Sequence, residues 1–340
     1  MWCGVFKNMA LDNLSFLERP KLKGEATIIG VPLDLGKDAE GTAEGPKTFR
    51  EAGLIETMKG IGLDVHDLGD LDVPDKETAD IGAVKLKYLD PIVKVCDELA
   101  HHVSGEVNLG RKVIVLGGDN SISIGSVSGA STALKGDLGL IWIDSHADII
   151  TDATTLSGNI HGMPVSALLG FGDSSLSNIY SDGQKIKPQN LVYVGLKDLD
   201  QAEIDTIRAL RVSTTTIVDI AEKGLSPAFE AIKKLSERVK NVWVCLDIDS
   251  MDEECAPGTP MATKGGLSYR ESINLARFIG KVCNVVGMDV TEFAPQLDRE
   301  NKTVKLAIEL ISCYLGSETN WYTRYMDEEM RKQAEREAAE

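Results

Sequence analysis

The stretch LGLIWIDSHAD, residues 138–148, joins an apolar run to three polar side chains that could bind a metal. A nearly continuous apolar run of this kind is typical of a strand that helices cover on both faces, as in a parallel sheet. Asp144, His146 and Asp148 follow the run at alternate positions, so they share one face if the segment stays extended. The stretch therefore predicts a buried parallel strand with a polar site at its carboxyl end.

The same kind of short apolar run recurs along the chain and alternates with amphipathic stretches. This alternation predicts a three-layer α/β fold, in which helices flank a parallel sheet of eight strands. The strands are expected at 26–33, 63–68, 112–116, 138–143, 191–195, 214–220, 242–246 and 282–288. Helices are expected around 46–60, 86–107, 201–210, 226–239, 269–282 and 304–315. Because no linker divides the chain, we expect one domain over 26–316, between an N-terminal extension, 1–25, and a charged C-terminal tail, 317–340.

Composition excludes several classes of partner. With 36 Lys and Arg against 53 Asp and Glu, the formal net charge is −17, which disfavours nucleic acid as a partner. No apolar stretch reaches the roughly 18 residues that a membrane span requires. The six cysteines show no CxxC spacing, as is usual for reduced cysteines in a cytoplasmic protein. We therefore expect a cytoplasmic protein with no membrane partner, although the opening residues leave an organellar presequence open.

Acidic or amide side chains also follow three other predicted strands, at Asp119 and Asn120, at Asp247 and Asp249, and at Asp289 and Glu292. Ligands of open α/β sheets collect at the carboxyl ends of the strands. Carboxylates crowded there repel one another unless a cation neutralises them, and hard oxygen ligands with one imidazole suit Mn²⁺ or Mg²⁺. A set of five ligands implies two metal ions, which would activate a bridging water for hydrolysis. The five are Asp144, His146, Asp148, Asp247 and Asp249.

Several motifs carry a resemblance to a known family, the ureohydrolases (arginase and agmatinase family). GGDNSISIGS at 117–126, IDSHADI at 143–149 and LDIDSMD at 246–252 resemble three metal-binding blocks of that family. SGNIHG at 157–162 is similar to the loop that marks arginases within it. The resemblance covers residues 26 to about 316. It implies an arginase/deacetylase-like fold and hydrolysis of L-arginine to L-ornithine and urea, by a homotrimer or hexamer.

The resemblance also implies a role for individual residues. Two Mn²⁺ ions per subunit would be held by the five ligands named above, with Asp144 and Asp247 bridging. His161 would shuttle protons, Asp148 would relay a proton to the leaving amine, and Glu292 would pair with the guanidinium of the substrate. The other implied substrate contacts are Ser157 and Asn159 to the α-carboxylate, Asp200 to the α-amino group, and Thr259 in the wall of the pocket.

Two departures from the family pattern lie at the site. Asn120 stands where the family has a metal-binding histidine, so we expect an amide as the sixth ligand and a weakened first metal site. Ile150 replaces an asparagine that contacts the substrate carboxylate in arginases. Two alternatives therefore stay open. Ile150 favours a hydrolase of agmatine or another guanidino compound, and Asn120 favours a metal-depleted, arginase-like pseudoenzyme with a binding role.

Overall fold

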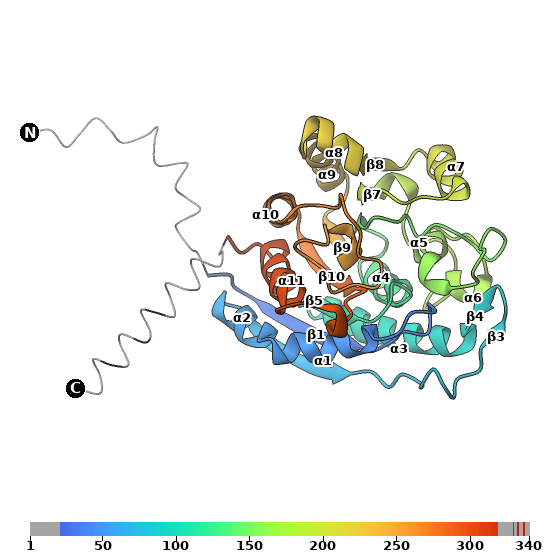
Figure 1. Ribbon diagram of the computed structural model, residues 1–340, viewed down its shortest axis with the longest axis horizontal. Helices are drawn as coiled ribbons and strands as arrows, with labels where there is room; N and C mark the ends of the chain where they lie inside the picture. Colours follow the sequence, from blue (N-terminus) through green and yellow to red (C-terminus); the bar gives the residue numbers. More distant parts are fainter. Residues whose placement is uncertain (1–20, 319–328, 330–331, 333–335, 337–340) are drawn as a thin grey trace, which may run out of the picture.

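The centre of the protein is an eight-stranded sheet (Figure 1). The computed structural model describes residues 21–318 together with residues 329, 332 and 336. Each neighbouring pair of strands in the sheet is parallel. From edge to edge, the strands are β2 (Asp64–Asp70), β1 (Glu25–Val31), β5 (Lys112–Gly117), β10 (Val285–Thr291), β9 (Asn241–Asp247), β6 (Leu138–Ile143), β7 (Leu191–Leu196) and β8 (Ser213–Thr216). The predicted fold class is confirmed.

Helices cover both faces of the sheet, and two buried clusters fill the space between the layers (Figure 1). Successive side chains of a strand point to opposite faces, so along β9 Val244 joins one cluster and Trp243 the other. One face carries α1 (Gly45–Glu51), α2 (Leu54–Gly60), α8 (Ile217–Lys223), α9 (Ser226–Arg238), α10 (Tyr269–Val282) and α11 (Lys302–Tyr314). The other carries α3 (Leu89–Asn108), α4 (Ile122–Ala133), α5 (Pro164–Leu168), α6 (Ser174–Ser177) and α7 (Gln201–Leu210).

Each predicted strand has a counterpart, but two boundaries were wrong. The strand expected at 214–220 ends at Thr216, where the Thr216 side chain accepts a hydrogen bond from the backbone of Asp219 and opens α8 as a capping box. The strand expected at 282–288 lies at Val285–Thr291, because α10 continues to Val282. At the first junction the strand itself is polar (STTT), and at the second an amphipathic helix ends just before an apolar strand, so hydrophobicity alone marks neither junction.

Two helix predictions also needed correction. The helix expected around 46–60 is two helices, since Gly53 between them has φ 86°, a left-handed conformation that interrupts the helical hydrogen bonds. The helix expected from residue 86 begins at Leu89, which places Pro91 in the first turn, where its missing N–H is not needed. Leu86–Lys87 instead forms a short strand, β4, paired antiparallel with β3 (Gly82–Ala83).

Helix α4 was not predicted, although it begins directly after the Asp119–Asn120 pair. Its first ten residues, Ile122–Ser131, are all buried, so the segment lacks the polar face that gives an amphipathic period. Close packing against α3 explains its glycines. A Cβ at Gly125 would lie 2.3 Å from the carbonyl oxygen of Cys96, and one at Gly129 would lie 2.3 Å from that of Ala100.

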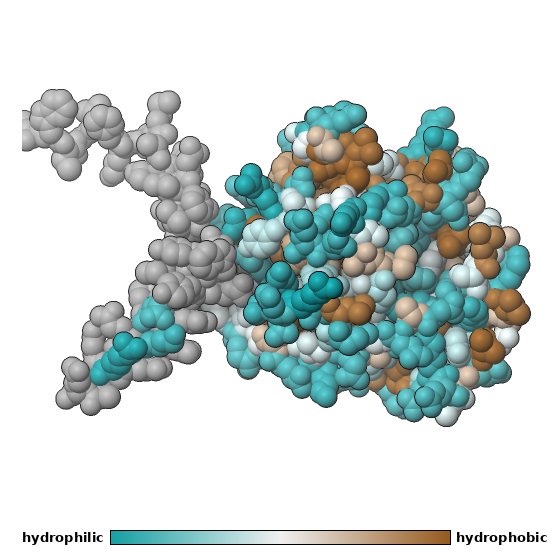
Figure 2. All heavy atoms as spheres, in the orientation of Figure 1, coloured by the Kyte–Doolittle hydropathy of each residue, from teal (hydrophilic) through white to brown (hydrophobic). Residues whose placement is uncertain are grey.

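The predicted extension, 1–25, and tail, 317–340, lie largely outside the described residues. None of the helices in the described part of the chain is long and apolar enough to cross a membrane. The face of the molecule shown in Figure 2 is mostly hydrophilic, in keeping with the net charge of −17.

Candidate metal and substrate site

The four strands that end in the polar motifs are neighbours in the sheet, in the order β5, β10, β9 and β6. Their carboxyl ends therefore bring together side chains that are distant in the sequence, around a cavity of about 210 Å³. The cavity is lined by Asn120, His146, Asp148, Ile150, His161, Gly162, Glu203, Asp247, Asp249, Met261 and Glu292. Asp144 is fully buried beside them.

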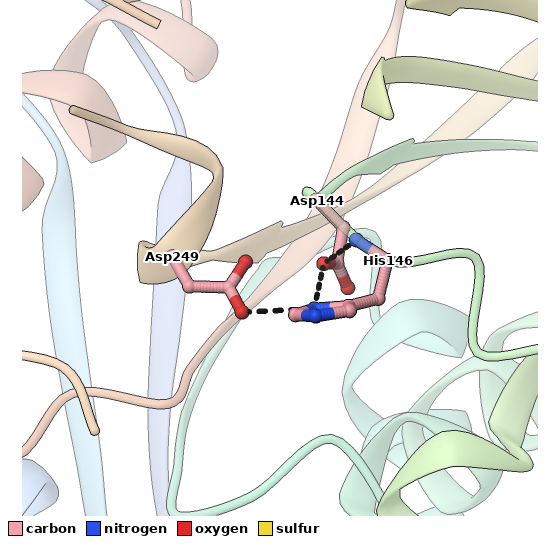
Figure 3. Close-up of side chains that lie close together, drawn as sticks. All are labelled: Asp144, His146 and Asp249. Carbon is pink, nitrogen blue, oxygen red and sulfur yellow. Dashed lines mark hydrogen bonds and ion pairs between the residues drawn. The ribbon is translucent and has the colours of Figure 1, made fainter. Parts of the chain in front are cut away.

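One part of this site, the His146 half, consists of Asp144, His146 and Asp249. Their side chains point toward one another (Figure 3), and one ligand atom from each lies within 4.8 Å of the other two. The Nδ1 atom of His146 lies 3.0 Å from Oδ2 of Asp249 and 3.5 Å from Oδ1 of Asp144. Two carboxylates and an imidazole are a donor set that suits a hard or borderline divalent cation. These residues therefore fit a metal ion.

Interactions between the charges of His146, Asp144 and Asp249 determine the protonation states in the His146 half. Burial by itself would lower the pKa of His146, but hydrogen bonds and charge from Asp144 and Asp249 raise it far above the usual value. Burial would raise the pKa of Asp249, yet the hydrogen bond and charge of His146 lower it. Burial and the charge of Asp249 raise the pKa of Asp144 to about 7. His146 and Asp249 therefore form an ion pair whose carboxylate is buried and whose imidazole is partly exposed, and metal binding would release the proton of the imidazole.

A second part of the site, the Asn120 half, consists of Asn120, Asp148 and Asp247. The amide nitrogen, Nδ2, of Asn120 donates hydrogen bonds to Oδ2 of Asp247 at 2.7 Å and to Oδ2 of Asp148 at 2.8 Å. The amide oxygen instead accepts a short hydrogen bond from the hydroxyl of Thr291. The atom of Asn120 that could bind a metal therefore faces away from the carboxylates.

Among the described residues, no lysine, arginine or histidine forms an ion pair with Asp148 or Asp247, the two carboxylates of the Asn120 half. Burial, together with the charge of Asp144, raises the pKa of Asp148 well above its usual value. Burial and the charges of Asp249 and Asp144 do the same for Asp247. Asp144 contacts both halves, because its Oδ1 accepts from the backbone of His146 at 2.7 Å while its Oδ2 lies 3.5 Å from the Asn120 nitrogen.

Glu292, at the end of β10, has both carboxylate oxygens engaged. His161 Nδ1 lies 3.3 Å from Oε1, and the ammonium of Lys37 forms a short ion pair with Oε2. Burial would raise the pKa of Glu292, but the charges of Lys37 and His161 hold it below its usual value. Sequence reasoning missed Lys37, because a loop lysine is usually exposed and no motif marks it.

Asp148 and Glu292 also share an uncommon backbone conformation. Their φ angles are 50° and 62°, in the left-handed region that costs a non-glycine residue about 1–2 kcal/mol. Backbone hydrogen bonds hold both: Val165 N–H donates to the carbonyl of Asp148 at 2.9 Å, and Glu292 N–H donates to the carbonyl of Gly118 at 2.7 Å. Strain of this kind concentrates at functional sites, where the surrounding fold maintains it.

Four residues expected to contact the substrate do not line the cavity. The Asp200 side chain caps α7, accepting a hydrogen bond from the backbone of Glu203 at 2.8 Å. The Asn159 side chain donates to Asp38 at 3.2 Å and accepts from Lys87 at 3.1 Å. The hydroxyl of Ser157 accepts from the backbone of Asn159, and Thr259 lines a separate hollow.

Glu203 lines the cavity in place of Asp200 and was also missed. It is the third residue of α7, and its carboxylate accepts a hydrogen bond at 3.0 Å from the backbone of Asp200. An aspartate followed three residues later by a glutamate, just after a buried strand, is a capping-box signature that could have placed it at the same sheet edge. Burial raises the pKa of Glu203.

The sheet and the acidic site at its carboxyl edge define an α/β protein of the ureohydrolase class, and known proteins narrow this further. A family model described as the arginase family matches residues 24–316. An arginase of Brevibacillus brevis is 38% identical over 293 residues, which cover 85% of this chain and 97% of that protein. The chain therefore belongs to the arginase family.

Solved structures agree with this assignment. The crystal structure of arginase from Bacillus cereus matches with a TM-score of 0.81 at 37% identity, covering 88% of this chain and 100% of that chain. Native arginase from Bacillus caldovelox matches with a TM-score of 0.82 at 36% identity, covering 86% of this chain and 98% of that chain. The predicted family and its class of hydrolases are thus confirmed.

Proposed function

We propose that the protein is a manganese-dependent arginase that hydrolyses L-arginine to L-ornithine and urea. The observation that carries the proposal is the convergence of Asp144, His146 and Asp249 beside a cavity that Glu292 and His161 also line. Membership of the arginase family, with curated arginases 35% to 38% identical, supports the same activity.

The metal would be held first by the His146 half, with Asp247 as a further ligand beside it. Bound there, Mn²⁺ would supply a water activated near neutral pH. A second ion would take the carboxylates of Asp148, Asp144 and Asp247 and would need the amide oxygen of Asn120. Because that oxygen faces Thr291, the amide must turn before it can bind a metal ion. This supports the expectation that the metal site at Asn120, called the first metal site above, is weakened.

The remaining groups would bind the substrate and handle protons. The carboxylate of Glu292 would face the guanidinium. Asp148 would pass a proton to the leaving amine nitrogen. His161 would exchange protons with solvent, which its side chain reaches with 30% of its surface exposed. We further propose, on the family resemblance, a cytoplasmic homotrimer or hexamer in which Ser157, Asn159, Asp200 and Thr259 approach the substrate.

A urea-release assay tests the proposal. The full-length protein is incubated with Mn²⁺ and assayed with L-arginine and with agmatine, while bound metal is counted by elemental analysis. We expect urea from L-arginine and a metal content nearer one than two ions per chain. Asn120→His should raise both metal content and rate. Turnover of agmatine alone would redirect the proposal to the agmatinase reaction, which Ile150 in the cavity wall favours.

A second candidate is a chain that binds a guanidino ligand without hydrolysing it. The hydrogen bonds from the Asn120 nitrogen to Asp148 and Asp247 favour it, because a neutral donor is directed where a second ion would lie. A folded protein that stays metal-free after incubation with Mn²⁺, binds L-arginine and releases no urea would support this candidate over the first.

A further inference from the structure

Lys37 is a buried lysine next to the substrate site. It lies in the loop that follows β1, and its side chain and that of Glu292 are each only 4% exposed. Lys37 does not line the cavity, whereas Glu292 and His161 do. The ammonium therefore meets Glu292 from behind, through the protein interior.

The loop backbone fixes this position. The backbone N–H of Gly36 donates to Asp119 at 2.7 Å, and the backbone N–H of His161 donates to the carbonyl of Gly36 at 3.0 Å. A Cβ at Gly36 would lie 2.0 Å from the hydroxyl oxygen of Ser121, so only glycine permits the approach. On the far side, Lys76 donates to the carbonyl of Lys37 at 2.7 Å. These contacts fix the backbone at Gly36 and Lys37 and thereby place the Lys37 ammonium next to Glu292.

The ion pair between Lys37 and Glu292 changes how strongly the cavity can bind a cation. Oε2 of Glu292 is bonded to Lys37, which leaves Oε1, itself 3.3 Å from His161. A guanidinium donates two parallel hydrogen bonds to a carboxylate when both oxygens are available. Here Lys37 occupies one oxygen, the other is shared with His161 and with the backbone N–H of Asn120 at 3.4 Å, and the negative charge of the carboxylate is already balanced by an ammonium. The electrostatic gain on binding a cation is correspondingly smaller.

We propose that Lys37 determines specificity by neutralising Glu292, which weakens binding of a cationic guanidino group relative to an uncharged group of the same shape. The inference rests on the proposed function in one respect, the assignment of Glu292 to the guanidinium end of the substrate. It goes beyond that function by naming the residue that limits affinity for the charged substrate.

The test compares L-arginine with L-citrulline, in which a neutral urea group replaces the guanidinium. Dissociation constants are measured by calorimetry on full-length protein treated with EDTA, so that no ligand is consumed. Lys37→Gln keeps a hydrogen-bond donor for Glu292 and removes the charge. We expect it to tighten L-arginine binding about tenfold and to leave L-citrulline binding unchanged. Lys37→Arg, which keeps the charge, should behave as the wild type does.

Lys264→Gln is the matched control, because it removes one positive charge from a side chain that is 87% exposed. An equal change for both ligands, or unchanged or weaker L-arginine binding in Lys37→Gln, would overturn the proposal. Glu292→Gln provides a test that does not depend on how Lys37 variants fold. It tests the premise that Glu292 meets the guanidinium: the variant should weaken L-arginine relative to L-citrulline, and an unchanged ratio would remove that premise and with it the proposal. These binding ratios need no turnover, so they are independent of whether urea is released.

Discussion

The two halves of the site contain the same number of residues and differ in one type of side chain. In the His146 half, an imidazole lies 3.0 Å from Asp249 and carries positive charge between two carboxylates. In the Asn120 half, a neutral amide donates to Asp148 and Asp247 at 2.8 Å and 2.7 Å. One half contains its own counter-charge and the other contains only hydrogen bonds.

The contrast between the halves explains how a buried acidic cluster can persist before a metal binds. An imidazole can give up its proton and become a ligand in the same place, so the His146 half exchanges one cation for another. An amide has no proton to give up, and its oxygen is bound to Thr291. The Asn120 half is thus satisfied as a hydrogen-bonded network yet poorly prepared for a metal ion.

The largest expected effect comes from breaking the ion pair of the His146 half. In metal-free protein at pH 7, Asp249→Asn leaves the charge of His146 poorly compensated, so we expect a loss of about 3–5 kcal/mol in the free energy of unfolding. Since the pKa of Asp249 is lowered, this stabilisation is present above pH 3.8 and disappears as the pH falls. Urea denaturation measures it, with the exposed Asp72→Asn as control. A loss below about 1 kcal/mol would mean that the ion pair between His146 and Asp249 does not stabilise the His146 half more than a surface pair would.

The next effect concerns metal affinity. His146→Ala should weaken Mn²⁺ binding more than about 100-fold, since even changes outside the ligand shell commonly cost 10–100-fold. Asn120→Ala should weaken it by a smaller factor, about tenfold, because the Asn120 nitrogen orients Asp148 and Asp247 and is not itself a ligand. Calorimetric titration of full-length protein provides both values, and His101→Ala, at an exposed position on α3, serves as control. Equal losses in the two variants would show that the halves do not differ as ligands.

A third effect has the opposite sign. In metal-free protein, Asp148→Asn should raise the free energy of unfolding at pH 7 by about 1–3 kcal/mol, because a neutral amide avoids the cost of burying the carboxylate or of keeping it protonated. The pKa of Asp148 is raised, so the folded protein keeps a proton that the unfolded chain has lost above pH 3.8. Raising the pH therefore destabilises the wild type, and the advantage of Asp148→Asn should grow between pH 5 and pH 8. If the difference in the free energy of unfolding between Asp148→Asn and the wild type stayed constant across this range, the raised pKa of Asp148 would be contradicted.

The smallest effect tests what orients the amide. Thr291→Val removes the hydroxyl that donates to the Asn120 oxygen, and we expect a loss of about 0.5–1.5 kcal/mol in the free energy of unfolding. Thr215→Val is the matched control, because the buried hydroxyl of Thr215 lacks a hydrogen-bond partner within the described structure. Its removal should cost little. Thermal unfolding resolves the two, and an equal loss in both variants would mean that Thr291 does not hold the amide.

The fold was largely predictable because most strands are buried on both faces. LGLIWI becomes β6 with every residue buried, so its apolar run has a direct physical cause. Helix α4 escaped prediction for the same reason, since complete burial erases the amphipathic period. Complete burial thus makes strands easy to predict in this chain and makes helices such as α4 and α5 hard to predict.

The site was predictable where a side chain follows a strand or, as for His161, where a motif marks it. Asp144 and Asp249 sit next to the ends of β6 and β9, and parallel strands bring such positions together. Lys37 reaches the site from a loop, whose path depends on tertiary contacts that no local pattern encodes. The cap at Asp200 is a local hydrogen bond that competes with a substrate role.

Asp144 links the two halves by its geometry, with one oxygen directed to each. Linkage between sites is reciprocal, so a cation that holds this carboxylate ionised in one half also changes the free energy of interactions in the other half. An ion bound by His146 and Asp249 would hold Asp144 ionised and strengthen the hydrogen bonds that its Oδ2 accepts, from Trp142 at 2.9 Å and from the Asn120 nitrogen at 3.5 Å. The Asn120 half would thus respond to occupancy of its neighbour without binding an ion itself.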